Sequence, residues 1–246
     1  MTEPRPIALI TGVGRPISIG TEIARQLAAD GWDIAVANHR PEQGFVADLT
    51  LELHELGART FAVETDLADP MAPGALVHAV TNSFGPVRAL IASHAESVDS
   101  SILNTSVESF DRHFAVNTRA NWLLIRAFAQ QYSAVPGLGR IVALTSDHTT
   151  HNLPYGASKG ALDRIVIAAA SELGHLGITA NLVNPGPVDT GWISPDLAET
   201  LRSETALGRL GTQRDAANLV SFLLSERGGW INGQLLHSNG GFHLPV

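Results

Sequence analysis

Two side chains that could carry out chemistry together, Tyr155 and Lys159, stand four positions apart. Residues 160–173 after them have the pattern of a helix, and residues four apart share one helix face. A phenol ordinarily has a pKa of about 10, and a nearby ammonium group favours the phenolate and lowers that pKa. The pair therefore predicts a tyrosine that exchanges a proton near neutral pH. An ordinary helix surface can carry the same spacing.

The N-terminal residues have the pattern of a nucleotide-binding unit. Residues 7–10 are an apolar run that predicts a buried strand, and residues 21–31 have the periodicity of a helix. Glycines between them allow the backbone to approach a pyrophosphate, and the helix N-terminus offers free N–H groups. A plain strand–helix connector is the alternative. The residues predicted to bind the cofactor here are Gly12, Gly14, Arg15, Ser18, Ile19 and Gly20.

The second predicted strand, residues 33–38, ends in Asn38, His39 and Arg40. In dinucleotide folds an acid at this point commonly binds the adenosine ribose, whereas a basic residue accommodates a 2′-phosphate. The acid is absent here and Arg15 adds a second cation, so we expect NADP(H) to be favoured over NAD(H). Surface polar residues after a strand are the alternative interpretation.

Strand and helix patterns alternate along the rest of the chain. This alternation predicts an α/β fold, a single-domain Rossmann-type doubly wound parallel sheet of about seven strands flanked by helices, over residues 1–246. Ligands bind beyond the carboxyl ends of such strands. Further strands are predicted at 59–67, 87–92, 140–146, 179–184 and 234–237, and helices at 43–56, 72–84, 107–132, 155–173 and 215–225.

Composition narrows the class of protein. The formal net charge of -8, without a basic run, argues against nucleic acid as a partner. Cysteine is absent, which excludes disulfides and thiolate metal ligands and fits a cytoplasmic location. The first residues lack a signal-peptide pattern, and no apolar run reaches the length of a membrane span.

Taken together, these motifs resemble those of the short-chain dehydrogenase/reductase family over nearly the whole chain. The resemblance implies hydride transfer between NAD(P)(H) and a small-molecule carbonyl or secondary alcohol, as in 3-oxoacyl thioester or ketone reductases. A dinucleotide-binding sensor or assembly protein without catalysis is the alternative. The matching residues are Thr11, Gly12, Gly20, Asp66, Leu67, Asn117, Ser146, Tyr155, Lys159, Asn184, Pro185 and Gly186.

The resemblance also implies a role for individual residues. Tyr155 would be the general acid or base, Lys159 would hold the nicotinamide ribose and lower the Tyr155 pKa, and Ser146 would bind the carbonyl oxygen. Asn117 would anchor a water that relays protons. Asp66, with a role as a helix N-cap or turn residue as its alternative, would meet the adenine. The remaining expected cofactor contacts are Leu67, Ser93, Pro185, Gly186, Val188 and Thr190. Residues 190–209 are expected to form the substrate lid, and the protein is expected to assemble as a homotetramer or homodimer.

Several positions depart from the family's usual pattern. Ser18 stands where a glycine is expected, in a loop about two residues longer, and residues 92–95 replace an asparagine-containing stretch. Ser146 precedes Tyr155 by nine positions rather than about thirteen, which predicts a short active-site wall; Thr145 and Thr149 are alternatives to Ser146. We expect His94, His148 and His151 to lie in loops or line the pocket rather than bind a metal ion. We expect Trp192 and Trp230 to pack in the core or the lid.

Overall fold

The computed structural model describes residues 4–133, 137–191 and 193–242. Seven strands form one sheet in the order β3-β2-β1-β4-β5-β6-β7, and every neighbouring pair is parallel. The predicted doubly wound sheet is therefore confirmed. The strands are β1 Ile7–Thr11, β2 Asp33–Asn38, β3 Thr60–Glu64, β4 Val87–Ala92, β5 Gly139–Leu144, β6 Ile178–Asn184 and β7 Leu235–His237.

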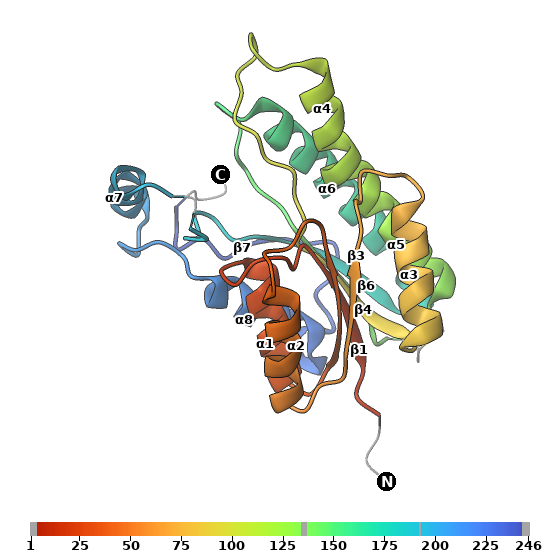
Figure 1. Ribbon diagram of the computed structural model, residues 1–246. Coiled ribbons are helices and arrows are strands. Elements are labelled where there is room, and N and C mark those ends of the chain that lie inside the picture. Colours follow the sequence, from red (N-terminus) through yellow and green to blue (C-terminus); the bar gives the residue numbers. More distant parts are fainter. Residues whose placement is uncertain (1–3, 134–136, 192, 243–246) are drawn as a thin grey trace.

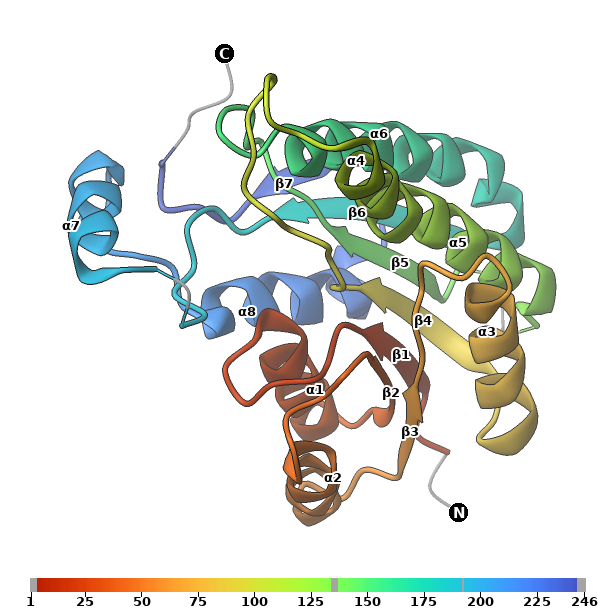
Figure 2. The same cartoon turned by 45° about the horizontal axis from the view of Figure 1, so that its top comes forward.

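Helices cover both faces of the sheet (Figures 1 and 2). One face of β1 carries Ala8 and Ile10 into a core with α1, α2 and α8, and the other carries Leu9 into a core with α3, α5 and α6. Parallel strands buried on both faces read as continuous apolar runs. The helices are α1 Ile19–Ala29, α2 Phe45–Glu55, α3 Ala72–Ser83, α4 Val107–His113, α5 Ala120–Gln131, α6 Leu153–Glu172, α7 Pro195–Glu204 and α8 Gln213–Leu224.

The structure differs from the sequence expectations in three places. The predicted helix 107–132 is interrupted by a π-helical segment, η1, at Phe114–Arg119. The polar segment expected as a lid contains α7, which lies apart from the sheet in Figure 2. Trp230 is 98% exposed, so its expected packing in the core or lid was wrong; Trp192 lies outside the described residues.

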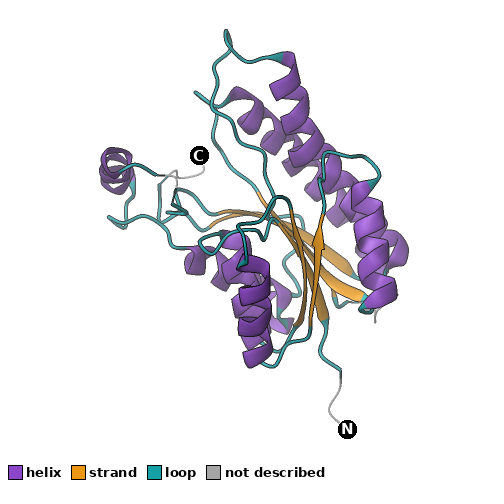
Figure 3. Ribbon diagram, viewed as in Figure 1, coloured by secondary structure: helices purple, strands orange, loops and turns teal. Residues whose placement is uncertain are grey.

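The order of the strands reverses beside β1, which lies between β2 and β4. Loops leaving this point in opposite directions open a crevice beyond the carboxyl ends of the strands, and Figure 3 shows the loops in teal. A cavity of about 430 Å³ lies there. Among the described residues, no helix combines the length and apolar character that crossing a bilayer requires.

Candidate active site

The cavity gathers most of the residues that the sequence singled out, although they come from six different strand ends. It is also lined by residues without a sequence motif, among them Thr65, Glu96, Arg112 and Leu144. The predicted residues that line it are Gly12, Gly14, Arg15, Ser18, Ile19, Asn38, His39, Arg40, Asp66, Leu67, Ser93, Tyr155, Lys159, Pro185 and Thr190.

The start of α1 is built to face an anion. Ser18 is its N-cap, in extended conformation, and its hydroxyl accepts a hydrogen bond from the Thr21 backbone N–H at 3.1 Å. An N-cap serine needs no glycine conformation, which explains why the expected glycine is replaced without blocking the loop. The helix's first N–H groups remain available to a phosphate.

Gly12 shows why a glycine is required earlier in this loop. Its φ is +80°, and a Cβ there would lie 2.6 Å from the His94 backbone nitrogen. Gly20 is confined too, since its Cβ would lie 3.0 Å from the Gly12 carbonyl oxygen. These glycines let the loop pack directly on the residues after β4.

The end of β2 provides polar and cationic groups. The Asn38 side-chain oxygen is buried and has no hydrogen-bond partner within the described residues. A buried acceptor without a donor is costly, and a ribose hydroxyl would supply the donor, so this site fits a dinucleotide. Arg40 is exposed and has a φ of 48°, an uncommon value for a residue other than glycine.

Asp66 follows β3, the strand beside β2, and the preceding Thr65 donates its backbone N–H to the Asn38 carbonyl oxygen at 2.8 Å. Its Oδ1 accepts from the Ala68 N–H at 2.9 Å, and its Oδ2 accepts from Arg112 at 2.9 Å. The hydrogen bond from Arg112 lowers the pKa of the Asp66 carboxyl. Asp66 therefore presents an ionised, oriented acceptor. It also closes the turn after β3 through Ala68, as the turn alternative predicted, whereas the N-cap of α3 is Met71; its contact with adenine remains a prediction.

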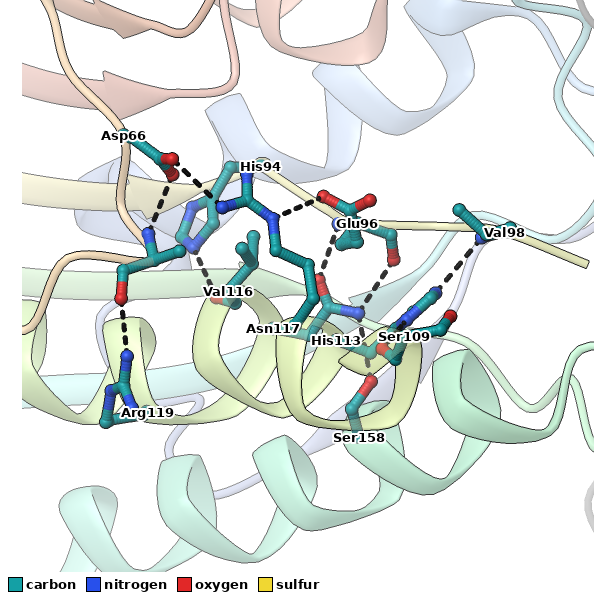
Figure 4. A network of polar contacts seen from close by, with 12 residues as sticks. Asp66, His94, Glu96, Val98, Ser109, His113, Val116, Asn117, Arg119 and Ser158 are labelled. Atoms are coloured by element: carbon teal, nitrogen blue, oxygen red, sulfur yellow. Dashed lines mark hydrogen bonds and ion pairs between the residues drawn. The ribbon is translucent and has the colours of Figure 1, made fainter. Parts of the chain in front are cut away.

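His94 is buried in the segment that follows β4. Its Nδ1 lies 2.6 Å from Thr11 Oγ1, and its Nε2 lies 3.1 Å from the Val116 carbonyl oxygen (Figure 4). Burial, together with the charge of Lys159, lowers the His94 pKa to about 3. A neutral imidazole thus ties β1 and the end of β4 to η1.

Tyr155 occupies the first turns of α6 with Lys159 one turn further. The Lys159 ammonium lies 5.7 Å from the centre of the Tyr155 ring and donates to the Leu144 carbonyl oxygen at 2.7 Å. Burial lowers the pKa of Lys159 from 10.5 to about 8, while Asp163 opposes this change. Lys159 is 2% exposed, and because its pKa is about 8 it remains mostly cationic at pH 7.

The pKa of Tyr155 moves in the direction opposite to that expected from the spacing. Burial raises it above its ordinary value, and the hydrogen bond with Ser146 opposes that change. Desolvation disfavours the phenolate. Its size depends on which residues pack around Tyr155 in the fold, and the four-residue spacing of Tyr155 and Lys159 in the sequence carries no information about that packing. Tyr155 is consequently a neutral phenol at physiological pH, the form that donates a proton.

Ser146 interacts with Tyr155 through its side chain but does not line the cavity, so its role toward a substrate remains a prediction. The alternative Thr145 lines the cavity, and its hydroxyl donates to Asp163 at 2.5 Å. The other alternative, Thr149, is exposed. The nine-residue spacing therefore still brings serine and tyrosine into contact.

The short wall between Ser146 and α6 is joined to the loop after β4. A β-bridge pairs Ser100 with Asn152, whose amide also donates to Ser97 at 3.0 Å and to Asp99 at 2.9 Å. The wall presses on α6 so closely that a Cβ on Gly156 would lie 2.1 Å from the His148 carbonyl oxygen. These contacts between distant segments compensate for the missing length.

Asn117 is fully buried in η1. Its amide pairs with both backbone groups of Glu96, at 2.8 and 2.9 Å, and donates to the Ser158 hydroxyl at 2.9 Å (Figure 4). Asn121 occupies the Asn117 carbonyl oxygen at 2.8 Å. Asn117 thus fastens the loop after β4 to α6; its expected water-anchoring role remains a prediction.

Two predicted contacts at the nicotinamide end do not line the cavity. Gly186, with a φ of +63°, packs against Asn239, where a Cβ would lie 2.4 Å from that side chain's Cβ. Val188 is buried and forms a bridge with Gly211. They support the neighbouring Pro185 and Thr190, which do line it.

The other histidines carry no metal-binding pattern. His148 and His151 are exposed in the short wall, and His151 has a φ of 62°. Across residues 4–133, 137–191 and 193–242, no three acidic or histidine side chains gather in a way that could hold a metal ion.

A signal that would have marked the site from sequence is the lysine count. Lys159 is the only lysine, and the other basic residues among the 16 Lys and Arg are arginines. A lone lysine at Tyr-x-x-x-Lys is far less expected by chance than one among many. No comparable signal marks Arg112, which lies within a helical pattern.

Comparisons with known proteins agree with this geometry. A family model described as Enoyl-(Acyl carrier protein) reductase matches residues 12–243. The chain is 36% identical over 241 residues to uncharacterized oxidoreductase YjdA of Bacillus subtilis (strain 168), covering 96% of each. It is 34% identical over 257 residues to the NADPH-dependent aldehyde reductase-like protein, chloroplastic, of Arabidopsis thaliana, covering 96% of this chain and 93% of that protein.

A solved structure extends the likeness to three dimensions. The blue fluorescent protein from a metagenomic library, in complex with NADPH, superposes with a TM-score of 0.90 at 31% identity, covering 97% of this chain and 98% of that one. The alternative of a dinucleotide-binding protein without catalysis is not favoured, since the relatives are named oxidoreductases and reductases. The chain is an NAD(P)-dependent oxidoreductase of the short-chain dehydrogenase/reductase family.

Proposed function

We propose that this protein is a reductase that uses NADP(H) in preference to NAD(H) and reduces an aldehyde or ketone. The observation that carries the direction is the neutral Tyr155 phenol in contact with Ser146. Carbonyl reduction needs a proton donor at the oxygen, whereas alcohol oxidation needs a base. A relative named as an NADPH-dependent aldehyde reductase supports both parts of the proposal.

The bound dinucleotide supplies the hydride, and the chain's own residues hold the carbonyl and move the proton. The Ser146 hydroxyl hydrogen-bonds the carbonyl oxygen and stabilises the negative charge that develops there. Tyr155 donates its proton to the same oxygen. Lys159, a buried cation one helical turn away, favours the phenolate that remains and binds the ribose hydroxyls. Asn117 positions this group by holding Ser158, whose hydroxyl donates to the Tyr155 carbonyl at 2.8 Å.

The preference for NADP(H) rests on the cations near the end of β2. Arg15, His39 and Arg40 line the cavity beside Asn38. β2 itself ends without an acid, while Glu64 at the end of β3 accepts a hydrogen bond from the Arg40 backbone N–H at 3.3 Å. A 2′-phosphate carries the negative charge that these groups would pair with, and charge-assisted hydrogen bonds are among the stronger ones.

Arg40→Asn tests this preference, because asparagine tolerates the left-handed backbone that Arg40 adopts. We expect the Kd for NADPH to rise about tenfold or more, corresponding to about 1.5 kcal/mol for a charged hydrogen bond. The Kd for NADH should change less than about twofold. Fluorescence titration of both cofactors measures the effect. A wild-type protein that binds NADH as tightly as NADPH would contradict the proposed preference.

The other proposals concern assembly and the lid. Val107, Phe110 and Trp122 are exposed apolar side chains on α4 and α5, which suits a homo-oligomer. Light scattering that shows only a monomer would oppose it. We propose residues 190–209, including α7, as the substrate lid because Thr190 reaches the cavity. A cytoplasmic location stays a prediction from the sequence.

A further inference from the structure

Arg112, which no sequence motif marked, joins two acids at the edge of the cofactor cavity. It lies on α4, donates through Nη1 to Asp66 Oδ2 at 2.9 Å and through Nε to Glu96 Oε2 at 3.2 Å. All three side chains line the cavity and are between 28% and 40% exposed. Exposed ion pairs contribute little stability, so the arrangement calls for another explanation than holding the fold.

The contacts leave the Asp66 carboxylate with one defined orientation. Arg112 occupies one oxygen, and the Ala68 N–H, at 2.9 Å, occupies the other. Each carboxylate oxygen accepts more than one hydrogen bond, so both retain accepting capacity toward the cavity. A carboxylate held in this way accepts hydrogen bonds and has none to donate.

The second contact fixes Arg112 itself. Its partner Glu96 is held through both backbone groups by the buried Asn117 side chain (Figure 4). The planar guanidinium group therefore spans two anchored acids, a geometry that a lysine ammonium would not reproduce.

We propose that Arg112 is a positioning residue that holds the Asp66 carboxylate to accept a hydrogen bond from the adenine amino group of NADP(H). The inference rests on the proposed function in one respect, namely that NADP(H) occupies this cavity. Arg112 acts through Asp66 and contacts neither the hydride nor the carbonyl, so it determines recognition of the base rather than the rate of the chemical step.

A cofactor without the amino group tests this assignment. Reduced nicotinamide hypoxanthine dinucleotide phosphate, the deaminated analogue of NADPH, carries a carbonyl oxygen where adenine carries its amine. That oxygen would face the Asp66 carboxylate without a proton between them. We expect wild-type protein to bind the analogue about 10- to 100-fold more weakly than NADPH, since the hydrogen bond from the amino group to the charged Asp66 carboxylate is lost.

Three variants separate positioning from simple loss of charge. Arg112→Met should raise the Kd for NADPH about fivefold and leave the Kd for the analogue unchanged, so that the ratio of the analogue's Kd to that of NADPH falls about fivefold, with kcat within about twofold of wild type. Arg112→Lys should restore the ratio only in part. Arg119→Met is the matched control, because Arg119 bonds the Ala68 carbonyl of the same loop without touching Asp66; its ratio should equal that of wild type.

A double-mutant cycle completes the test. In an Asp66→Ala background, Arg112→Met should cause no further change in the ratio, since the residue that it positions is gone. A ratio in Arg112→Met equal to that of wild type would overturn the proposal. If both Kd values rise equally in that variant, Arg112 contacts a phosphate directly instead. If wild-type protein binds NADPH and the analogue with equal Kd values, the proposed role of Arg112 is refuted while the proposed function is left intact. Wild type that binds neither cofactor refutes the proposed function.

Discussion

Lys159 offers the sharpest test of the site, because it is a buried cation and the only lysine in the chain. The change is Lys159→Met, which keeps the length of the side chain and removes the charge. The comparison is between a protein with Lys159 and one with Met at that position, and both also carry Tyr155→Phe. This removes the titration of Tyr155, which the charge of Lys159 would otherwise influence.

The magnitude follows from the pKa of Lys159. It is 10.5 in an unfolded chain and about 8 in the folded protein, because burial disfavours the ammonium. The difference between these values, at about 1.4 kcal/mol for each pKa unit, corresponds to about 3 kcal/mol. Asp163 and His94 are the titratable neighbours of Lys159, and both remain in each protein.

The direction is set by proton binding. Between pH 8 and 10.5 the unfolded lysine is protonated while the folded lysine is neutral, so the unfolded state binds more protons. Stability therefore rises with pH in that window for the protein with Lys159, relative to the Met variant. Below pH 8 and above pH 10.5 the difference between the two free energies of unfolding should stay constant.

Two measurements check the reasoning. Urea titrations from pH 7 to 11 should show the difference in free energy of unfolding changing by about 3 kcal/mol in favour of the lysine protein. Lysine labelled with ¹³C at Cε gives one side-chain NMR signal, which should titrate near pH 8 without cofactor. A titration midpoint at or above 10.5, together with a constant stability difference, would refute the claim that burial depresses this pKa.

Three further substitutions, with one control, probe Tyr155 and the wall beside it. Tyr155→Phe should lower kcat at least about 100-fold with the NADPH Kd unchanged, and turnover near the wild-type rate would contradict its acid role. Gly156→Ala should lower the free energy of unfolding by about 1–3 kcal/mol and raise KM for the carbonyl substrate, since its Cβ meets the His148 carbonyl. The control is Gly160→Ala, which has open space around it and should be neutral or stabilising by up to about 1 kcal/mol in thermal unfolding. Asn152→Ala should raise KM and cost about 1–3 kcal/mol, and an unchanged KM would mean that the wall holds its shape without it.

Much of the fold was predictable because its signals are local. Apolar runs ended by turn residues marked β1 and β2, and alternation with helical periodicity led to the parallel sheet. The π-helical segment was not predictable, since residues 114–119 have the same periodicity as the helix around them. Nor was α7, because its polar composition resembles that of a loop.

The site was predictable in its residue types and incomplete in its contacts. Tyr155, Lys159 and Ser146 stood out by spacing and by their place after a strand. His94 as a neutral bridge, and Arg112 as a partner of Asp66, depend on segments 83 and 46 positions apart in the sequence. No pattern within one segment reports such a pairing, so only the folded chain could identify it.

By itself, the sequence determined which chemistry is available: a phenol and an ammonium one helical turn apart, glycines that let a backbone approach phosphate, and strand ends that must meet at one edge of the sheet. The tertiary structure decided the ionisation state of these groups. Desolvation depends on what packs around a side chain from elsewhere in the chain, and it keeps Tyr155 a neutral phenol while lowering the pKa of Lys159 to about 8.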